Sequence, residues 1–173
     1  MTLNDISQPL PLDAAHDLTF FDSGEASLDY WLKNRAVKND RTGASRTYVT
    51  CNNRNKVVGY YCLAAGAIGH EEAPKSMRRN MPDPIPVLVL GRIAIDIDYQ
   101  NLGLGKALLR DATRRALQAS RISGVVALIV HALSEQAKKF YLSCGLTESP
   151  TKPMMLCLVL ATAERVLTEN RQK

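Results

Sequence analysis

The sequence lacks the features that would place the protein in a membrane or on a secretory route. Its longest nearly apolar runs, Tyr60 to Ile68 and Met154 to Ala161, are much shorter than the roughly 20 residues that span a bilayer. The first residues, MTLNDISQPL, lack the positive start and the apolar core of a signal peptide. We therefore expect a cytoplasmic protein that does not enter a membrane.

Cysteine is too scarce and too scattered to suggest a metal centre. The cysteines stand singly, without a C-x-x-C pair and without a nearby histidine at the spacing of metal ligands. They are Cys51, Cys62, Cys144 and Cys157. We expect buried free thiols and no bound metal.

The overall composition is that of an ordinary globular protein with a basic surplus. With 173 residues and 46% hydrophobic content, the chain suits one domain, residues 1–173, with a sizeable core. Lysine and arginine total 22 against 17 acidic residues, a net charge of +5, which permits an anionic partner without requiring one. The single tryptophan, Trp31, is expected in the core or on a helix-packing surface.

The most informative stretch runs from Leu90 to Leu117, where a hydrophobic strand leads through a glycine turn into a helix. Aliphatic residues mark the strand, and small or aliphatic residues then recur every four positions from Leu104 to Ala116, which is one face of a helix. Gly103 and Gly105 let the backbone approach a ligand closely. The first helical amides lack intrahelical partners and, with the helix dipole, favour an anion such as a pyrophosphate.

Two common phosphate-binding motifs do not fit this turn. A Walker A loop needs glycine where Gln100 stands and Ser or Thr where Ala107 stands. A dinucleotide fingerprint needs a third small residue where Leu108 stands. The remaining pattern, Gln100-x-x-Gly103-x-Gly105, resembles the R/Q-x-x-G-x-G/A acyl-CoA loop of the GCN5-related N-acetyltransferase (GNAT) family. The alternative is a strand–helix connection that needs only flexible residues.

The rest of the chain alternates between helices, strands and one long loop. A helix over Glu25–Lys38, capped by Ser23 or Asp22, follows an extended lead-in. An antiparallel hairpin and a proline-rich basic loop come next, and after the central helix come a strand, a helix that Ser134 can cap, another strand and a polar tail. These ranges are Ser45–Cys51 and Lys56–Ile68 for the hairpin, Gly69–Pro86, Gly124–Val130, Ser134–Gly145, Met154–Ala161 and Glu164–Lys173.

This order of elements resembles the GNAT fold, a mixed α/β (α+β) architecture whose central sheet is splayed at the acyl-CoA site. The resemblance implies that the backbone of the central strand meets the pantetheine arm of acetyl-CoA and that turn amides hold its pyrophosphate. It also implies a tyrosine as general acid, which is Tyr141. The implied acetyl-CoA residues are Ile93, Ala94, Ile95, Gln100, Asn101, Leu102, Gly103, Leu104, Gly105 and Lys106.

Several blocks resemble a narrower group, the acetyltransferase toxins of type II toxin–antitoxin modules. The blocks are FDSGEASLDYWLKNRA, GASRTYV, VVGYYCLAAGAI, LGRIAID and the Phe140–Tyr141 pair. These toxins acetylate the amino group of aminoacyl-tRNA and so stop translation. The resemblance implies the same activity here, with acetyl-CoA as the donor, together with a homodimer and a ribbon-helix-helix antitoxin.

The chemistry of acetyl transfer is compatible with this substrate. A phenol with a pKa of about 10 stays protonated at neutral pH and can give its proton to the departing thiolate. No general base stands out, since an alternative role for Asp96 and Asp98 is to end the strand. An α-amino group, with a pKa of about 7.7 to 8.0, is already partly neutral and needs less help than lysine. Tyr141 has an alternative role as an aromatic residue that packs under the sheet.

Basic residues provide candidate contacts to the tRNA backbone. Arg92 lies in the central strand, where a buried charge without a partner is costly, so we expect it to face a cleft or an acidic group. For the others the alternatives are a solvated helix face or contacts to an antitoxin. The candidates for phosphate contacts are Lys33, Arg35, Arg78, Arg79 and Arg92.

Two other functions remain open on the sequence alone. The first is acetylation of a polyamine, an antibiotic or a protein N-terminus, which needs an acidic pocket for a cationic amine. The second is a regulatory module that binds acyl-CoA without catalysis. The basic loop argues against the first, and the glycines with Tyr141 argue against the second.

Overall fold

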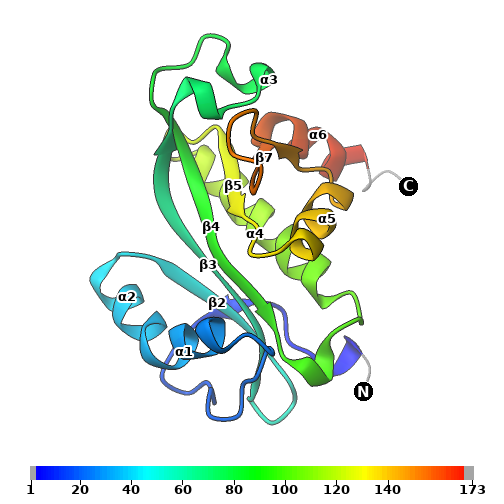
Figure 1. Ribbon diagram of the computed structural model, residues 1–173. Helices are drawn as coiled ribbons and strands as arrows, with labels where there is room; N and C mark the ends of the chain where they lie inside the picture. Colours follow the sequence, from blue (N-terminus) through cyan, green and yellow to red (C-terminus); the bar gives the residue numbers. More distant parts are fainter. Residues whose placement is uncertain (1–2, 170–173) are drawn as a thin grey trace. The chain divides into compact units, whose positions relative to one another are not determined.

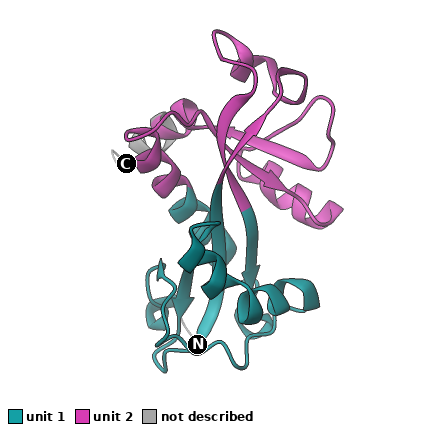
Figure 2. Cartoon of the chain, turned by 90° about the vertical axis from the view of Figure 1, so that its left-hand side faces the viewer, with its two compact units in different colours: residues 1–64, 91–112 teal, residues 65–90, 113–173 magenta. Residues whose placement is uncertain are grey.

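A computed structural model describes residues 3–169 of the chain, and the side chains of residues 3–164. The chain forms two compact units (Figure 2). Unit 1 comprises Met1–Ala64 and Gly91–Ala112, and unit 2 comprises Ala65–Leu90 and Thr113–Lys173. No helix among the described residues is both long and apolar enough to cross a membrane.

Unit 1 holds the helices and strands of the N-terminal part together with the glycine turn. Its elements are η1 (Leu3–Asp5), β1 (Leu10–Pro11), α1 (Ala26–Asn34), α2 (Ala36–Thr42), β2 (Arg46–Cys51) and η3 (Ile97–Tyr99). Three longer elements belong to both units by their residue ranges, namely β3 (Val57–Ile68), β4 (Ile85–Ile95) and α4 (Leu104–Ser120). In Figure 1, α1 and α2 lie along β2 and β3.

Unit 2 holds the C-terminal elements and the proline-rich loop. Its own elements are η2 (His70–Glu72), α3 (Lys75–Arg78), β5 (Ala127–His131), α5 (Glu135–Ser143), β6 (Thr147–Glu148), β7 (Met155–Val159) and α6 (Leu160–Glu169). The backbone of the loop is tied to the segment before β7, since Ser149 Oγ donates to Glu72 O at 2.6 Å and Lys152 Nζ lies 2.8 Å from Glu72 Oε1.

The strands follow the order β1-β2-β3-β4-β5-β7-β6. β4 and β5 run parallel, whereas β1–β2, β2–β3, β5–β7 and β6–β7 are antiparallel. The sheet is therefore mixed, as predicted. Parallel neighbours need a long connection between them, and the connection from β4 to β5 contains α4. The predicted hairpin is confirmed as β2 and β3.

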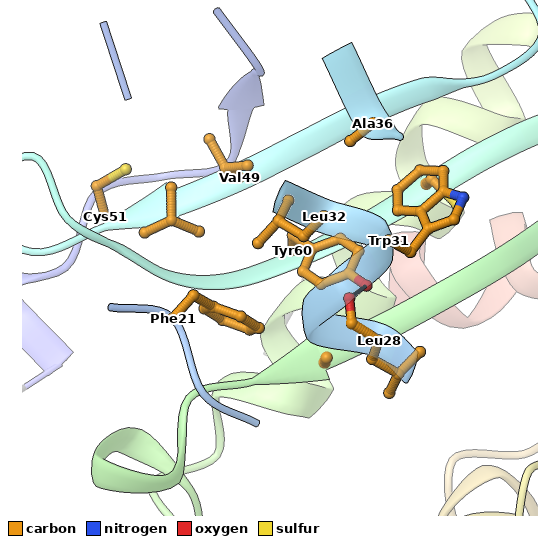
Figure 3. Packing of buried hydrophobic residues seen from close by; sticks show 11 residues of the cluster. Phe21, Leu28, Trp31, Leu32, Ala36, Val49, Cys51 and Tyr60 are labelled. Atoms are coloured by element: carbon orange, nitrogen blue, oxygen red, sulfur yellow. Dashed lines mark hydrogen bonds between the residues drawn. The ribbon is translucent and has the colours of Figure 1, made fainter. Parts of the chain in front are cut away.

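One face of the unit 1 strands packs against α1. Leu28, Trp31 and Leu32 of this helix are buried at helical spacing and lie against Tyr60 of β3 and Val49 of β2 (Figure 3). Tyr60 also donates its hydroxyl hydrogen to Leu28 O at 2.7 Å, which satisfies the one polar atom of the buried ring. This packing fixes the position of α1 relative to β3.

The opposite face of β3 in unit 1 carries Gly59, where α4 packs closely. A Cβ atom at Gly59 would lie 3.1 Å from Ile95 Cδ1 and 3.2 Å from Leu108 Cδ1. The first turns of α4 therefore lie against β3 and the end of β4. In unit 2 a second core gathers residues of β3, β4, β5 and β7 around the proline-rich loop. Its members include Ile68, Met77, Ile85, Ile129 and Met155.

Several element boundaries differ from the sequence-based prediction. The helix predicted over residues 25–38 is two helices, α1 and α2, that meet at Arg35. Neither Ser23 nor Asp22 caps α1, because the N-cap residue is Glu25 and has no side-chain cap hydrogen bond. Ser23 Oγ donates to Asp29 Oδ1 at 2.6 Å and accepts from Glu25 N at 3.2 Å. β4 begins at Ile85, inside the predicted loop. The predicted polar tail begins within α6, and its last residues, 170–173, lie outside the described part.

Candidate functional site

The turn between β4 and α4 is built around two hydrogen-bonded side chains. Asp96 caps η3 by accepting from Asp98 N at 3.0 Å, and it also accepts from Asp22 N at 3.1 Å. Gln100 donates from its side-chain amide to Ser23 O and to Ile95 O, both at 2.9 Å. The connection from strand to helix is thus held from two sides, and both carboxylate oxygens of Asp96 accept backbone hydrogen bonds.

The backbone of the same turn has the conformation that an anion-binding loop requires. Asn101 and Gly103 have positive φ angles of 64° and 86°, which glycine adopts without strain. A Cβ atom at Gly103 would meet no atom within 4 Å, so the space above this backbone is open. Leu104 is buried and anchors the start of α4, whereas Leu102 and Lys106 are exposed.

This geometry is suited to an anion such as a diphosphate. The first amides of the 17-residue helix α4 have no acceptor within the helix, and the helix dipole places partial positive charge at this end. The exposed Lys106 adds a full positive charge beside them. The turn can therefore accept an anion that approaches the backbone around Gly103 and Gly105.

The strand segment Ile93–Ile95 extends past the neighbouring strand. β5 pairs with β4 in parallel from Val87 to Leu90 and ends at His131, whereas β4 continues to Ile95. Ala94 is buried in the core beneath α1, and Ile95 points to the opposite face, toward Gly59. Backbone groups on the β5 side of this segment therefore lie beyond the strand that could pair with them, as expected where a sheet splays.

Tyr141 lies on α5 in unit 2 and is buried, with 6% of its surface exposed. Ser134 caps this helix as predicted, since its Oγ accepts from Ala137 N at 3.1 Å. Burial raises the pKa of the Tyr141 phenol to about 12, and the nearby Cys144 thiol acts in the same direction. Among the described residues the phenol has no hydrogen-bond partner, so its proton is available to a substrate.

Arg92 lies on the face of β4 that packs against α1. Its guanidinium carbon lies 4.5 Å from the centre of the Trp31 ring, a cation–π contact. Burial raises the pKa of the neighbouring Cys62 thiol, and the charge of Arg92 together with hydrogen bonds from Arg92 and Gly91 opposes that rise. The guanidinium thus lies between an aromatic ring and a sulfur atom rather than against a carboxylate.

The remaining predicted cations are placed in two groups. Lys33 and Arg35 are exposed at the end of α1 in unit 1. Arg78 is half-buried at the end of α3 in unit 2, and Arg79 follows it on the surface. Unit 1 therefore contains Lys33, Arg35 and Arg92 as well as the glycine turn and Ile93–Ile95, and unit 2 contains Tyr141 and the two loop arginines.

The cysteines are free, and no site for a metal ion is apparent in residues 3–164. Cys51, Cys62 and Cys157 are buried, as predicted, whereas Cys144 is only half-buried. No group of three His, Cys, Asp or Glu side chains within this range could hold a metal ion.

Sequence reasoning did not assign a role to the contact between Trp31 and Arg92. Tryptophan was expected in the core, where it indeed lies with 7% of its surface exposed. Arg92 was expected to face a cleft or an acidic group. The sequence offers little basis for predicting this contact, because Trp31 and Arg92 lie on different elements and no sequence spacing relates them.

Comparison with known proteins places this geometry among acetyltransferases. The sequence profile of the acetyltransferase (GNAT) domain matches residues 43–148. A tRNA-acetylating toxin of Mycobacterium tuberculosis is 45% identical over 161 residues, which cover 93% of this chain and 96% of that protein.

Two solved structures of toxins show the same fold. AtaT in complex with acetyl-methionyl-tRNAfMet matches with a TM-score of 0.87 and 32% identity, over 94% of this chain and 99% of that one. A mutant of AtaT bound to the C-terminus of the antitoxin AtaR and to acetyl-CoA matches with a TM-score of 0.81 and 30% identity, over 95% of this chain and 99% of that one.

Proposed function

Because the chain belongs to the GNAT acetyltransferase family, we propose that it is a toxin that transfers the acetyl group of acetyl-CoA to the α-amino group of aminoacyl-tRNA and thereby blocks translation. The observation that carries this proposal is the 45% identity to a tRNA-acetylating toxin across 93% of the chain. The glycine turn supplies the physical basis for binding the donor.

We assign the acetyl donor to unit 1. Backbone amides from Leu102 to Lys106 hold the diphosphate at the start of α4, where the helix dipole favours negative charge. Backbone groups of Ile93–Ile95, which extend past β5, hydrogen-bond the pantetheine arm. Gln100 braces the turn through its bonds to Ser23 O and Ile95 O, and Asn101 supplies one of its positive φ angles.

Tyr141 serves as the general acid in this proposal. When the carbon–sulfur bond breaks, negative charge develops on the sulfur, and the protonated phenol donates a hydrogen bond to it. The pKa of about 12 lies above that of an ordinary thiol, about 8.5. Full proton transfer to a free thiolate is therefore uphill, so the phenol stabilises the departing sulfur as a hydrogen-bond donor, and the proton that the attacking amine loses leaves a neutral phenol and a neutral thiol at the end of the reaction.

The amine requires little activation. An α-amino group has a pKa of about 7.7 to 8.0, and the ester bond to tRNA lowers it further, so a useful fraction is neutral at physiological pH. Asp96 and Asp98 are not needed as bases, and both oxygens of Asp96 already accept backbone hydrogen bonds. This agrees with an α-amine rather than a lysine side chain as the acceptor.

Basic side chains bind the phosphate backbone of the tRNA in this proposal. They are Lys33, Arg35, Arg78, Arg79 and Arg92. None of them forms an ion pair with a carboxylate among the described residues. A cation without an acidic partner is available to phosphate, and such contacts contribute sequence-independent, salt-sensitive affinity.

The experiment that tests the function incubates the protein with labelled acetyl-CoA and charged total tRNA, with deacylated tRNA and a polyamine as parallel acceptors. We expect label on charged tRNA only. Tyr141→Phe should lower kcat by about 10²- to 10⁴-fold, which is the usual contribution of a general acid. Label on the polyamine alone would indicate a small-amine acetyltransferase, and uptake of acetyl-CoA without transfer would indicate a binding module.

A control variant for this experiment is Tyr30→Phe, which removes a phenolic hydroxyl from a tyrosine that is 58% exposed on α1. We expect it to keep nearly full activity. An equal loss in both variants would show that the phenol of Tyr141 has no special role.

We further propose that the chain acts as one acetyltransferase domain over residues 1–173, in the cytoplasm where its substrate occurs. β3, β4 and α4 each contribute residues to both units, and the relatives match over nearly the whole chain. A homodimer and a ribbon-helix-helix antitoxin complete the proposal. Light scattering of the purified protein tests the dimer, and coexpression with any small reading frame found beside its gene tests the antitoxin.

A further inference from the structure

The side chain of Arg92 enters the space between β4 and α1 in unit 1. Arg92 and Ala94 are two residues apart on the strand and so share one face. Ala94 lies in the core cluster with Leu28 and Trp31 of α1. The guanidinium carbon of Arg92 then reaches 4.5 Å from the centre of the Trp31 ring.

The ring that supports Arg92 is itself held in place. Trp31 stacks on Tyr60 with the ring centres 6.0 Å apart and the planes at 10°. The hydroxyl of Tyr60 donates to Leu28 O at 2.7 Å, on the same helix as Trp31 (Figure 3). A flexible arginine side chain loses less entropy on binding when a fixed aromatic surface already restricts it.

Arg92 has no acidic partner in this position. Within the described residues no carboxylate oxygen lies at salt-bridge distance from its guanidinium. Arg46 offers a contrast, because its Nη1 lies 2.9 Å from Asp40 Oδ1. A half-buried guanidinium that the protein holds but does not neutralise is suited to an external anion.

The position of Arg92 along the strand indicates which anion it meets. It immediately precedes Ile93–Ile95, the segment assigned to the pantetheine arm, and a strand rises by only about 3.3 Å per residue. The attacking amine is joined through an ester to the ribose of the terminal nucleotide. The nearest negative charge on the acceptor is therefore the phosphate that links this nucleotide to the preceding one.

We propose that Arg92 binds the phosphate on the 5′ side of the terminal adenosine of aminoacyl-tRNA, and that Trp31 is the positioning residue that holds the guanidinium for this contact. The inference rests on the proposed function and deepens it. It separates Arg92, which binds the acceptor end next to the reacting amine, from the exposed cations that contact the rest of the tRNA.

The test compares kcat/KM on three acceptors that differ in their phosphates. Aminoacyl-adenosine has no phosphate, aminoacyl-CpA has the one assigned to Arg92, and full aminoacyl-tRNA has all of them. For Arg92→Gln we expect a loss on CpA and on tRNA that exceeds the loss on adenosine by at least about tenfold, the contribution of a charge-assisted hydrogen bond.

The positioning role of Trp31 has its own signature. Trp31→Phe keeps an aromatic ring but weakens the cation–π contact, so we expect the same pattern at about two- to fivefold. In the Arg92→Gln background, Trp31→Phe should add no further difference between CpA and adenosine. Arg46→Gln is the matched control, because its guanidinium is paired with Asp40, and it should leave the ratio between acceptors unchanged. Thermal unfolding confirms that each variant is folded.

Other outcomes overturn the inference. An equal loss of kcat/KM on all three acceptors in Arg92→Gln would show that Arg92 does not bind this phosphate. A loss confined to full tRNA would place its contact on the body of the tRNA. Wild-type protein that acetylates none of the aminoacylated acceptors would overturn the proposed function as well.

Discussion

The environment of one side chain, Tyr141, determines how firmly its phenol holds its proton. Its phenol is buried on α5, and desolvation raises its pKa to about 12. The charged phenolate is disfavoured because the surroundings cannot solvate it. The consequence is a donor that stays protonated throughout the physiological range, which a general acid for a leaving thiolate requires.

The same pKa predicts how stability depends on pH. The pKa of Tyr141 in the native protein is raised above its value of about 10 in the unfolded chain. Between pH 10 and pH 12 the tyrosine therefore ionises in the unfolded chain but stays neutral in the native protein, and this difference lowers the free energy of unfolding. Over that window we expect the wild type to lose about 2 to 3 kcal/mol more unfolding free energy than Tyr141→Phe. Urea unfolding of both proteins between pH 9 and pH 11.5 measures the difference. Parallel pH profiles would show that Tyr141 titrates like an exposed tyrosine.

At the scale of an element, the turn from β4 to α4 combines two properties that one short segment rarely has. It is braced by side chains, through Asp96 and Gln100. Its backbone is nevertheless open above Gly103, where the φ angle is 86° and an added Cβ would meet no atom. A rigid turn with an accessible backbone can bind an anion without first paying the cost of ordering.

A comparison of two glycines in unit 1 distinguishes an effect on ligand binding from an effect of backbone strain. Gly103 and Gly43 have φ angles of 86° and 83°, and neither has an atom within 4 Å of an added Cβ. A left-handed conformation costs an L residue about 1 to 2 kcal/mol, so valine at either position should lower stability. Only Gly103→Val should also raise the Kd of acetyl-CoA, by at least about tenfold, the effect of one lost charge-assisted hydrogen bond.

Isothermal titration calorimetry measures the Kd of acetyl-CoA for both variants. Gly43→Val is the control, because it introduces the same backbone strain at the end of α2. If both variants bind acetyl-CoA equally well, the turn does not hold the diphosphate. If both lose binding equally, the loss reflects stability and not the turn.

At the scale of the whole molecule, the net charge of +5 matters through its distribution. Basic residues with a carboxylate partner, such as Arg46, Arg121 and Lys152, are neutralised locally. Arg78 and Arg79 have none among the described residues and lie in the basic loop of unit 2. Charges of this kind act together on a polyanion, since each phosphate contact releases counterions.

Reversing the two loop charges should therefore weaken tRNA acetylation selectively. We expect Arg78→Glu with Arg79→Glu to raise the KM for aminoacyl-tRNA by about tenfold or more and to reduce the salt dependence of KM. The Kd of acetyl-CoA should stay nearly unchanged. The double variant Arg46→Glu with Arg121→Glu changes the net charge by the same amount at paired positions outside the loop and should have a smaller effect. Equal losses for both substrates in the loop variant would contradict the assignment.

The extent to which the sequence predicted each feature follows from the range of the interactions involved. The β2–β3 hairpin, the glycine turn and the Ser134 cap depend on neighbouring residues, and all three were predicted. The break at Arg35 was not predicted, because no glycine or proline marks it and Ala36 continues the buried stripe of Leu28 and Leu32. The start of β4 at Ile85 depends on its partner strand β5, which lies about 40 residues later in the sequence.

The sequence by itself determined the glycine turn before α4, the Ser134-capped helix that carries Tyr141 and the membership of the GNAT family, because each depends on residue types at short spacings. Only the tertiary structure decided which basic residues are neutralised, how far Tyr141 is buried and that Trp31 supports Arg92. These properties arise where separate elements meet, and desolvation and ring contacts depend on distances that residue order does not encode.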